Sequence, residues 1–420
     1  MTTPTASAPI SPPPAQTERT APSDRFRAKR DRILDAASQV INERGLRGLT
    51  FVSVAEAVNM NTTSITYYFK RKELLAAATL QRTIDKMQVG AEMALREPTP
   101  EARVKRLLTY VMEESAEERI GHRRPLARLS DIRSLQEPLR TELNNRYMDL
   151  FRMVVKFFDD LPSSRRDLNW ARTYVLLDSL HWARVWLNKY SVGDYERVHA
   201  RLMELYRHGY AGEGQTWDPA RLDVPNSDTE STEVNRETYL RAATIMMNER
   251  GYRGASVERI AGALNLSKGS FYHHLDGKDG LVTDCFDRSY TRVSLTQRAA
   301  MALEGSWFDR LTAATAALTD VQFEATFPLL RVTALSALPR ELRLPILERS
   351  DRISQRFAGM MIDGITEGSI RAIDPLIASQ CLIASLNSAF DFRLWAEHRQ
   401  DRDTAVRLYS SVLAFGMLDR

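Results

Sequence analysis

Two short segments, residues 61–69 and 267–275, carry polar side chains at most positions, with single apolar residues between them. The first segment reads NTTSITYYF and the second reads SKGSFYHHL. Hydroxyl, amide, imidazole and phenol groups on one face of a helix can hydrogen-bond to base edges and to backbone phosphates. The side-chain chemistry of both segments therefore favours contact with double-stranded DNA.

Metal chemistry is a weaker interpretation of the same residues. His273 and His274 are adjacent, so on a helix their side chains point about 100° apart, and the sequence offers no third ligand near them. The sequence also lacks recognisable motifs for nucleophilic catalysis, phosphate-binding loops and zinc hydrolysis. We therefore expect no metal, no cofactor and no enzymatic activity.

The residues before each polar segment predict the helices that position it. Gly45 and Gly251 stand where a first helix needs a left-handed residue to end it. Thr50 and Ser256 follow as N-caps of a short second helix.

A tight turn then leads into each polar segment. Asn59 and Asn265 occupy the turn position that needs a positive φ, which asparagine tolerates better than other residues with a side chain. Asn61 and Ser267 come next as N-caps of a third, polar helix. This order is the helix-turn-helix, which places its second helix in the major groove.

The chain contains this arrangement twice. The run NERGLRGLT that starts at Asn42 returns as NERGYRGAS at Asn248, and the pairing continues without gaps to Lys72 and Lys278. The shift of 206 positions is about half of the 420 residues, so the repeated unit is a whole subunit. The predicted divisions are a disordered tail at 1–24, helix-turn-helix domain 1 at 25–75, helical domain 1 at 76–211, a linker at 212–233, helix-turn-helix domain 2 at 234–281 and helical domain 2 at 282–420.

Outside the tail and the linker, almost every segment has a helical pattern. Apolar residues recur at spacings of three and four, and strand-like alternation between hairpin turns is missing. The sequence therefore predicts an all-α fold of two tandem units, each a three-helix DNA-binding domain followed by a helical bundle. The linker is long enough that it does not force one geometry on the two halves.

With these motifs, the sequence resembles the TetR family of one-component regulators. The second copy, with residues 267–274 and 278–281, is a close match to the family pattern Ser-Lys-Gly-Thr-Leu-Tyr-x-His-Phe and Lys-Glu-x-Leu. The first copy departs from it, with Thr66 where the pattern has tyrosine and Tyr68 where it has histidine. The resemblance and the polar helix faces give these candidate DNA-binding residues: Arg25, Arg27, Lys29, Thr50, Thr62, Thr63, Ser64, Thr66, Tyr67, Tyr68, Lys72, Ser256, Lys268, Gly269, Ser270, Tyr272, His273, His274 and Lys278.

A basic cluster, residues 25–32, precedes the first helix-turn-helix and has no equivalent in the second copy. It is either a solvated helix start or an arm that contacts phosphates or the minor groove. The tyrosines of the polar helices likewise have two interpretations, as DNA contacts or as half-buried packing residues.

The resemblance also implies functions for the helical bundles. Each would bind a small, largely apolar effector and supply a two-helix dimer face, at 168–190 with 194–209 and at 375–397 with 401–416. The bundles would form an intramolecular pseudo-dimer or a homodimer. Because the polar helices differ, the operator half-sites should be unequal, and the chain should act as a repressor.

The rival hypothesis is a ligand-binding or protein-interaction module in which one DNA-binding motif is vestigial. The net charge of +4 is too small to decide between the two. With only Cys285 and Cys381, no membrane-length apolar run and no secretory signal in the sequence, we expect a cytoplasmic location without membrane contact.

Overall fold

The computed structural model confirms an all-α fold, and in the part of the chain that it describes every element of regular structure is helical. The predicted tail, apart from Asp24, and half of the predicted linker lie outside that part. The described residues are 24–222, 236–267, 269, 278–324, 326–338, 340–399 and 401–418.

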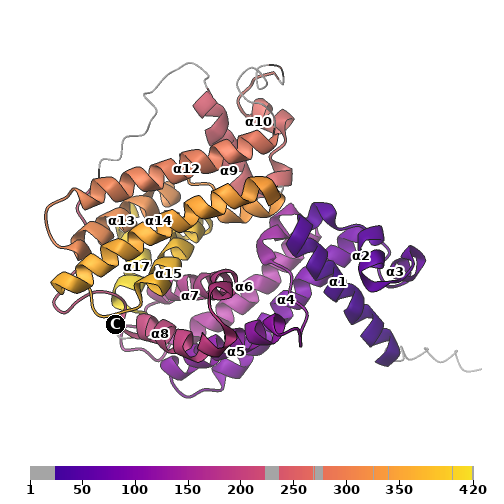
Figure 1. Cartoon of the computed structure of the whole chain (residues 1–420), viewed down its shortest axis with the longest axis horizontal. Helices are drawn as coiled ribbons and strands as arrows, with labels where there is room; N and C mark the ends of the chain where they lie inside the picture. The colour runs from indigo at the N-terminus through magenta and orange to yellow at the C-terminus, as the bar shows by residue number, and fades with distance from the viewer. Residues whose placement is uncertain are drawn as a thin grey trace, which may run out of the picture.

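The first half places its three N-terminal helices apart from its bundle (Figure 1). Its helices are α1 Asp24–Gly48, α2 Phe51–Val58, α3 Thr62–Tyr68, α4 Lys72–Leu95, α5 Pro100–Arg119, α6 Leu139–Val155, α7 Arg166–Trp186 and α8 Tyr195–His208, with short 3-10 turns η1 Leu129–Ser134, η2 Lys156–Phe158, η3 Leu187–Lys189 and η4 Val192–Asp194.

The second half repeats this order. Its helices are α9 Arg236–Gly254, α10 Val257–Ala263, α12 Lys278–Met301, α13 Trp307–Glu324, α14 Arg340–Glu367, α15 Pro375–Ser388, α16 Arg393–Glu397 and α17 Arg402–Phe415, with turns η5 Val332–Ala337 and η6 Ala389–Phe392. The boundaries predicted at 75–76 and 281–282 fall inside α4 and α12, because each of these helices packs on both the DNA-binding helices and the bundle.

The two halves meet through α7 and α8 of the first and α15 and α17 of the second (Figure 1). These helices lie close to the ranges predicted for dimer faces. The Ser179 hydroxyl of the first half contacts the Cys381 thiol of the second half at 3.2 Å. Tyr174 stacks on Phe392 with ring centroids 4.4 Å apart. One apolar core therefore runs through both bundles.

The ends of the last two helices cross each other. Gly209 and Gly416, which end α8 and α17, have φ of 68° and 80°. The Tyr210 amide donates to the Ala414 carbonyl at 2.9 Å, and the Met417 amide donates to the Tyr206 carbonyl at 2.7 Å. This reciprocal pairing is the local symmetry of a dimer interface, here within one chain.

The start of the predicted linker is not free of the second half. The Gly212 amide donates to the Ser369 carbonyl at 2.9 Å, and Arg221 pairs with Asp403 at 2.8 Å. Trp217 packs on the shared core. The described linker residues thus contact the second half, while residues 223–233 of the predicted linker lie outside the described part of the chain.

The two N-terminal units are packed differently. Helices α1–α3 have their own apolar core, to which α4 and the η1 segment contribute. The core of α9 and α10 is continuous with the shared core of the bundles. The first unit is therefore joined to the rest of the molecule through less apolar contact than the second.

The turn residues have the positive φ angles that the sequence predicts. Asn59 and Asn265 have φ of 53° and 57°, and Gly45 and Gly251 have φ of 62° and 69°. The glycines are not left-handed helical, however, because their ψ values are −178° and 171°. The chain bends there and continues as a helix to Gly48 and Gly254.

No described helix has the length and apolar character needed to cross a membrane.

The crossing at Gly209 gives a test of the junction. A β-carbon on Gly209 would lie 2.3 Å from the Ala414 carbonyl oxygen, whereas one on Gly214, also at positive φ, would meet no atom within 4 Å. Alanine strains the backbone at both positions by about 1–2 kcal/mol, and only Gly209→Ala adds overpacking of about 1–3 kcal/mol. We expect urea unfolding to show a larger loss of stability for Gly209→Ala than for Gly214→Ala; equal losses would contradict the crossing.

Candidate nucleic-acid interface and effector pocket

The caps of α2 and α3 are built as the sequence predicts. The Thr50 hydroxyl accepts from the Ser53 amide at 3.0 Å, and the Ser53 hydroxyl accepts from the Thr50 amide at 3.0 Å. Asn61 Oδ1 accepts from both the amide and the hydroxyl of Ser64, at 2.7 and 2.8 Å. Ile65 is fully buried and fixes the inner face of α3. The turn between the two helices is therefore rigid at both ends.

The outward face of α3 divides its polar residues into two groups. Thr62 and Thr63 are exposed, and Tyr67 is 64% exposed. Ser64 is used in the cap, and the Thr66 hydroxyl donates to the Thr63 carbonyl at 2.9 Å. Thr62, Thr63 and Tyr67 are thus the side chains of α3 with the most open hydrogen-bonding surface.

An aromatic cluster ties the start of α1 to α3. The ring centroid of Phe26 lies 4.7 Å from that of Tyr68 and 6.2 Å from that of Tyr67. Tyr68 is half-buried and also packs on the core of the first unit. The packing interpretation therefore fits Tyr68, while the exposed Tyr67 is placed to touch a partner.

The basic cluster at 25–32 divides into residues that pack on the fold and residues that stay exposed. Arg30 lies over the Phe69 ring at 5.4 Å, and Arg32 donates to the Val58 carbonyl at 3.2 Å, so these two stabilise the fold. Arg25 and Arg27 are exposed and Lys29 is half-exposed, with Arg27 paired to Asp24. Because Phe26 packs on Tyr67 and Tyr68, this turn of α1 lies close to α3.

The residues at the start of α4 add positive charge, and only one of them was among the candidate DNA-binding residues. Lys72 was a candidate, and the neighbouring Lys70 and Arg71 are exposed as well. They directly follow α3, where a DNA backbone would pass if α3 lay in the major groove. The run Lys-Arg-Lys was the sequence signal for them.

Much of the second recognition segment lies outside the described residues. Ser256 is half-exposed, and its hydroxyl accepts from the Arg259 amide at 3.3 Å as the N-cap of α10. Gly269 is exposed, and Lys278 begins α12. The candidate residues outside the described part are Lys268, Ser270, Tyr272, His273 and His274.

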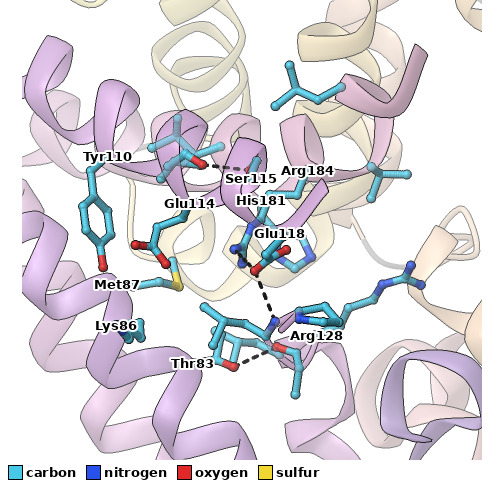
Figure 2. A pocket seen from close by; sticks show the side chains of 18 of the residues that line it. Thr83, Lys86, Met87, Tyr110, Glu114, Ser115, Glu118, Arg128, His181 and Arg184 are labelled. Carbon is cyan, nitrogen blue, oxygen red and sulfur yellow. Dashed lines mark hydrogen bonds and ion pairs between the residues drawn. The ribbon is translucent and has the colours of Figure 1, made fainter. Parts of the chain in front are cut away.

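The first bundle encloses a cavity of about 470 Å³ (Figure 2). Its apolar wall includes Met87, Leu107, Val111, Leu177 and Leu180. These residues come from α4, α5 and α7, and its volume falls in the range of small-molecule sites. The sequence named no lining residue, because helix-bundle pockets leave no motif.

Charged side chains also line the cavity (Figure 2). Glu118 accepts from Arg184 at 2.9 Å and from the Leu126 amide at 3.2 Å, so its charge is balanced. Lys86 and Arg128 also line the cavity, and both are exposed.

The floor of the cavity is bonded to α1 and α4. Asn42 Nδ2 donates to the Leu126 carbonyl at 2.9 Å, and Asn42 Oδ1 accepts from the Arg128 amide at 3.0 Å. The Thr83 hydroxyl of α4 donates to the Ala127 carbonyl at 2.9 Å. Residues 126–128 thus touch the cavity and the DNA-binding helices at once; we call this contact the asparagine clasp.

The second half has the same clasp. Asn248 Nδ2 donates to the Leu329 carbonyl at 2.9 Å, and Asn248 Oδ1 accepts from the Arg331 amide at 3.0 Å. Asn42 and Asn248 are the asparagines of the repeated NERG run. In the sequence these two asparagines indicate the duplication, but no motif there predicts their hydrogen bonds to the cavity floor.

Against the family models, the chain matches the model described as "Bacterial regulatory proteins, tetR family" twice, at residues 33–79 and 240–285. Both matched segments coincide with the helix-turn-helix units, so each unit is of the TetR type. Proteins of this family are DNA-binding transcription regulators and are not enzymes, and the chain carries two helix-turn-helix matches to it.

Two relatives were found among curated proteins. The TetC protein of transposon Tn10 from Escherichia coli is 26% identical over 86 residues, which is 20% of this chain and 44% of TetC. The HTH-type transcriptional repressor KstR2 from Rhodococcus jostii is 29% identical over 161 residues, which is 35% of this chain and 74% of KstR2. The match to TetC therefore spans less than half of that protein.

Solved structures of the family also match. PfmR from Thermus thermophilus is 22% identical with a TM-score of 0.36, and the match covers 42% of this chain and 97% of PfmR. AibR in complex with isovaleryl coenzyme A and operator DNA is 18% identical with a TM-score of 0.37, and the match covers 43% of this chain and 98% of AibR.

His181 of the cavity wall gives a pH test. Burial, and then the nearby Arg184 and Arg128, lower the pKa of His181 to about 4, so its imidazole is neutral at pH 7. Because an unfolded histidine titrates near 6.5, the unfolded state binds the proton more readily between pH 6.5 and 4. The stability contributed by neutral His181 is complete above pH 6.5 and is lost as the pH falls.

We expect His181→Gln to remove about 2 kcal/mol of the stability difference between pH 7 and pH 5, measured by urea unfolding. His122→Gln is the matched control, because the side chain of His122 is 69% exposed. The same pH dependence in wild type and His181→Gln would show that His181 is not held neutral.

Proposed function

We propose that this chain represses transcription by binding an operator with both helix-turn-helix units, and that a small molecule in the first-half cavity tunes that binding. The asparagine clasp carries the proposal, because residues 126–128 form the cavity floor and hydrogen-bond to α1. A ligand that displaces this floor would act on the first DNA-binding unit directly, through the hydrogen bonds between the floor and α1. The name of KstR2, a transcriptional repressor, supports the sign of regulation.

A single chain supplies both recognition helices in this proposal. The dimer-type faces of α7, α15 and α17 are packed against one another within the chain. A second copy is then not needed to bring two units together. Since residues 62–68 and 268–274 differ in sequence, the two half-sites should differ as well.

The cavity suggests an amphipathic effector rather than the largely apolar one expected from the family. Its aliphatic wall suits a hydrocarbon or aromatic group. Lys86 and Arg128 offer positive charge, while the carboxylate of Glu118 is balanced by Arg184. The ligand class that fits is a small molecule with an apolar body and one anionic group.

The DNA contacts are tested by Thr62→Ala, Thr63→Ala and Tyr67→Ala, singly and together. Each lost contact should cost about 1–3 kcal/mol, so the triple variant should bind a duplex selected by the wild-type chain at least a hundredfold more weakly in a gel shift. Thr366→Ala, at an exposed position of α14, is the matched control.

Footprinting and native mass spectrometry on the same duplex test whether a single chain binds both half-sites. The expected result is two unequal protected half-sites and one chain per duplex. Identical half-sites, or a triple variant that binds like the wild type, would contradict the proposed mode of binding.

The effector site is tested with the fluorescent anion 8-anilinonaphthalene-1-sulfonate, which has an apolar body and one sulfonate. We expect Val111→Trp to fill the cavity and Arg128→Gln to remove a positive charge, each weakening dye binding about tenfold or more in a fluorescence titration. Ile362→Trp is the control, because Ile362 is 51% exposed on α14. Equal dye affinity in all four proteins would place the dye elsewhere and contradict the ligand site.

A further inference from the structure

A second hollow lies between the two halves, beside the second DNA-binding unit. Its volume is about 600 Å³, and one wall comes from the end of η1 and the start of α6, the other from α9 and α10. The described residues that line it include four arginines and no acidic residue. They are Arg133, Ser134, Leu135, Gln136, Arg140, Arg250, Gly254 and Arg259. We call it the arginine groove.

The arginines of the groove differ in what holds them. Arg133 is committed to the junction of the halves, because it donates to the Asn248 carbonyl at 2.8 Å and pairs with Asp391 at 2.5 Å. Arg140 pairs at 2.6 Å with Glu137, which is not among the residues that line the groove. Arg250 and Arg259 are exposed, and neither forms an ion pair with any described residue. Arg259 donates to the Gly254 carbonyl at 3.3 Å, and within the described part of the chain no carboxylate balances the charge of these two guanidinium groups.

The groove lies beside DNA-binding elements of both halves. Arg259 is on α10, the helix that precedes the second recognition segment and that crosses the DNA backbone in helix-turn-helix proteins. Residues 134–136 line the arginine groove and also a smaller hollow against the first unit, which Lys72 and Glu73 line. The same three residues thus stand between the two units. A β-carbon on Gly251 would lie 2.8 Å from the Ser134 hydroxyl, which shows how closely this segment meets α9.

We propose that the arginine groove binds the phosphate backbone of the operator in the stretch between the two half-sites, through Arg250 and Arg259, with Arg140 at its edge. This rests on the proposed function and adds a contact that reads no base. Guanidinium groups suit phosphate because their planar donors can engage two of its oxygens.

Duplex DNA fits the groove better than a free anion does. The groove is open rather than enclosed, so it does not surround a small ion. Its two walls come from different halves of the chain, so a backbone held there also fixes the distance between the DNA-binding units. A non-specific contact at this place strengthens binding to every duplex that both units can reach, without changing which bases are preferred.

The test uses Arg250→Gln with Arg259→Gln and a duplex that the wild-type chain has selected from a random library. Each lost phosphate contact lowers the slope of log K against log salt by about 0.9, so the double variant should lose about 1.8. Hydroxyl-radical footprinting should show lost protection between the half-sites, with the base preference unchanged. The control is Arg152→Gln with Arg197→Gln, which removes the same charge at exposed positions of α6 and α8.

An unchanged salt slope in the Arg250→Gln, Arg259→Gln chain would overturn the inference. A second outcome would also overturn it. If pyrophosphate protects the wild-type chain but not the double variant from thermal unfolding, and both have the same salt slope, the groove holds a free anion and not DNA. If the double variant does not fold, Arg250→Gln and Arg259→Gln alone should each lower the slope by about half as much.

The Thr62, Thr63 and Tyr67 triple variant separates this inference from the proposed function. If the triple variant loses operator binding and the arginine variants keep the wild-type slope, only the arginine groove fails. If the wild-type chain selects no duplex, the proposed function itself fails.

Discussion

The asparagine clasp is the contact on which the link between bundle and DNA-binding helices depends. In each half, one amide side chain uses its donor and its acceptor on a single short stretch of backbone, at 2.9 and 3.0 Å. Asn248 is only 2% exposed, so its loss would leave backbone groups of the floor segment without partners. Unmet hydrogen bonds of this kind cost about 1–3 kcal/mol each. This explains why the duplicated NERG run keeps its asparagine in both halves.

The arginine of each clasp shows how the halves have diverged. Arg128 is exposed and lines the first cavity, whereas Arg331 is 9% exposed and pairs with Asp391 at 2.5 Å. Asp391 also pairs with Arg133 of the first half, so one carboxylate holds two guanidinium groups at the junction. Burial raises the pKa of Asp391, and the charge of Arg133 opposes that shift. An arginine that faces a cavity in one half thus fixes the contact between the halves in the other.

The sequence could predict what depends on neighbouring residues. The caps at Thr50 and Asn61 and the positive φ of Asn59 and Asn265 follow from local chemistry, and the structure has them. It could not separate Arg30 and Arg32, which stabilise the fold, from Arg25, because their partners lie on α2 and at the end of α3. The cavity and the arginine groove were beyond prediction for the same reason, since each is formed by segments far apart in the chain.

The position of η1 extends the influence of the first cavity to both DNA-binding units. The cavity floor continues directly into η1, which contacts α1, α4 and α9, while η5 of the second half contacts α1 and α9 in turn. A ligand shifts such an arrangement only as far as it binds one conformation better than the other. Since the shared core joins α9 and α10 to the bundles and α1–α3 have a core of their own, the first unit is the one that can move at lower cost. An effector in the first half would therefore act mainly by repositioning α1–α3 against a second unit that the core holds in place.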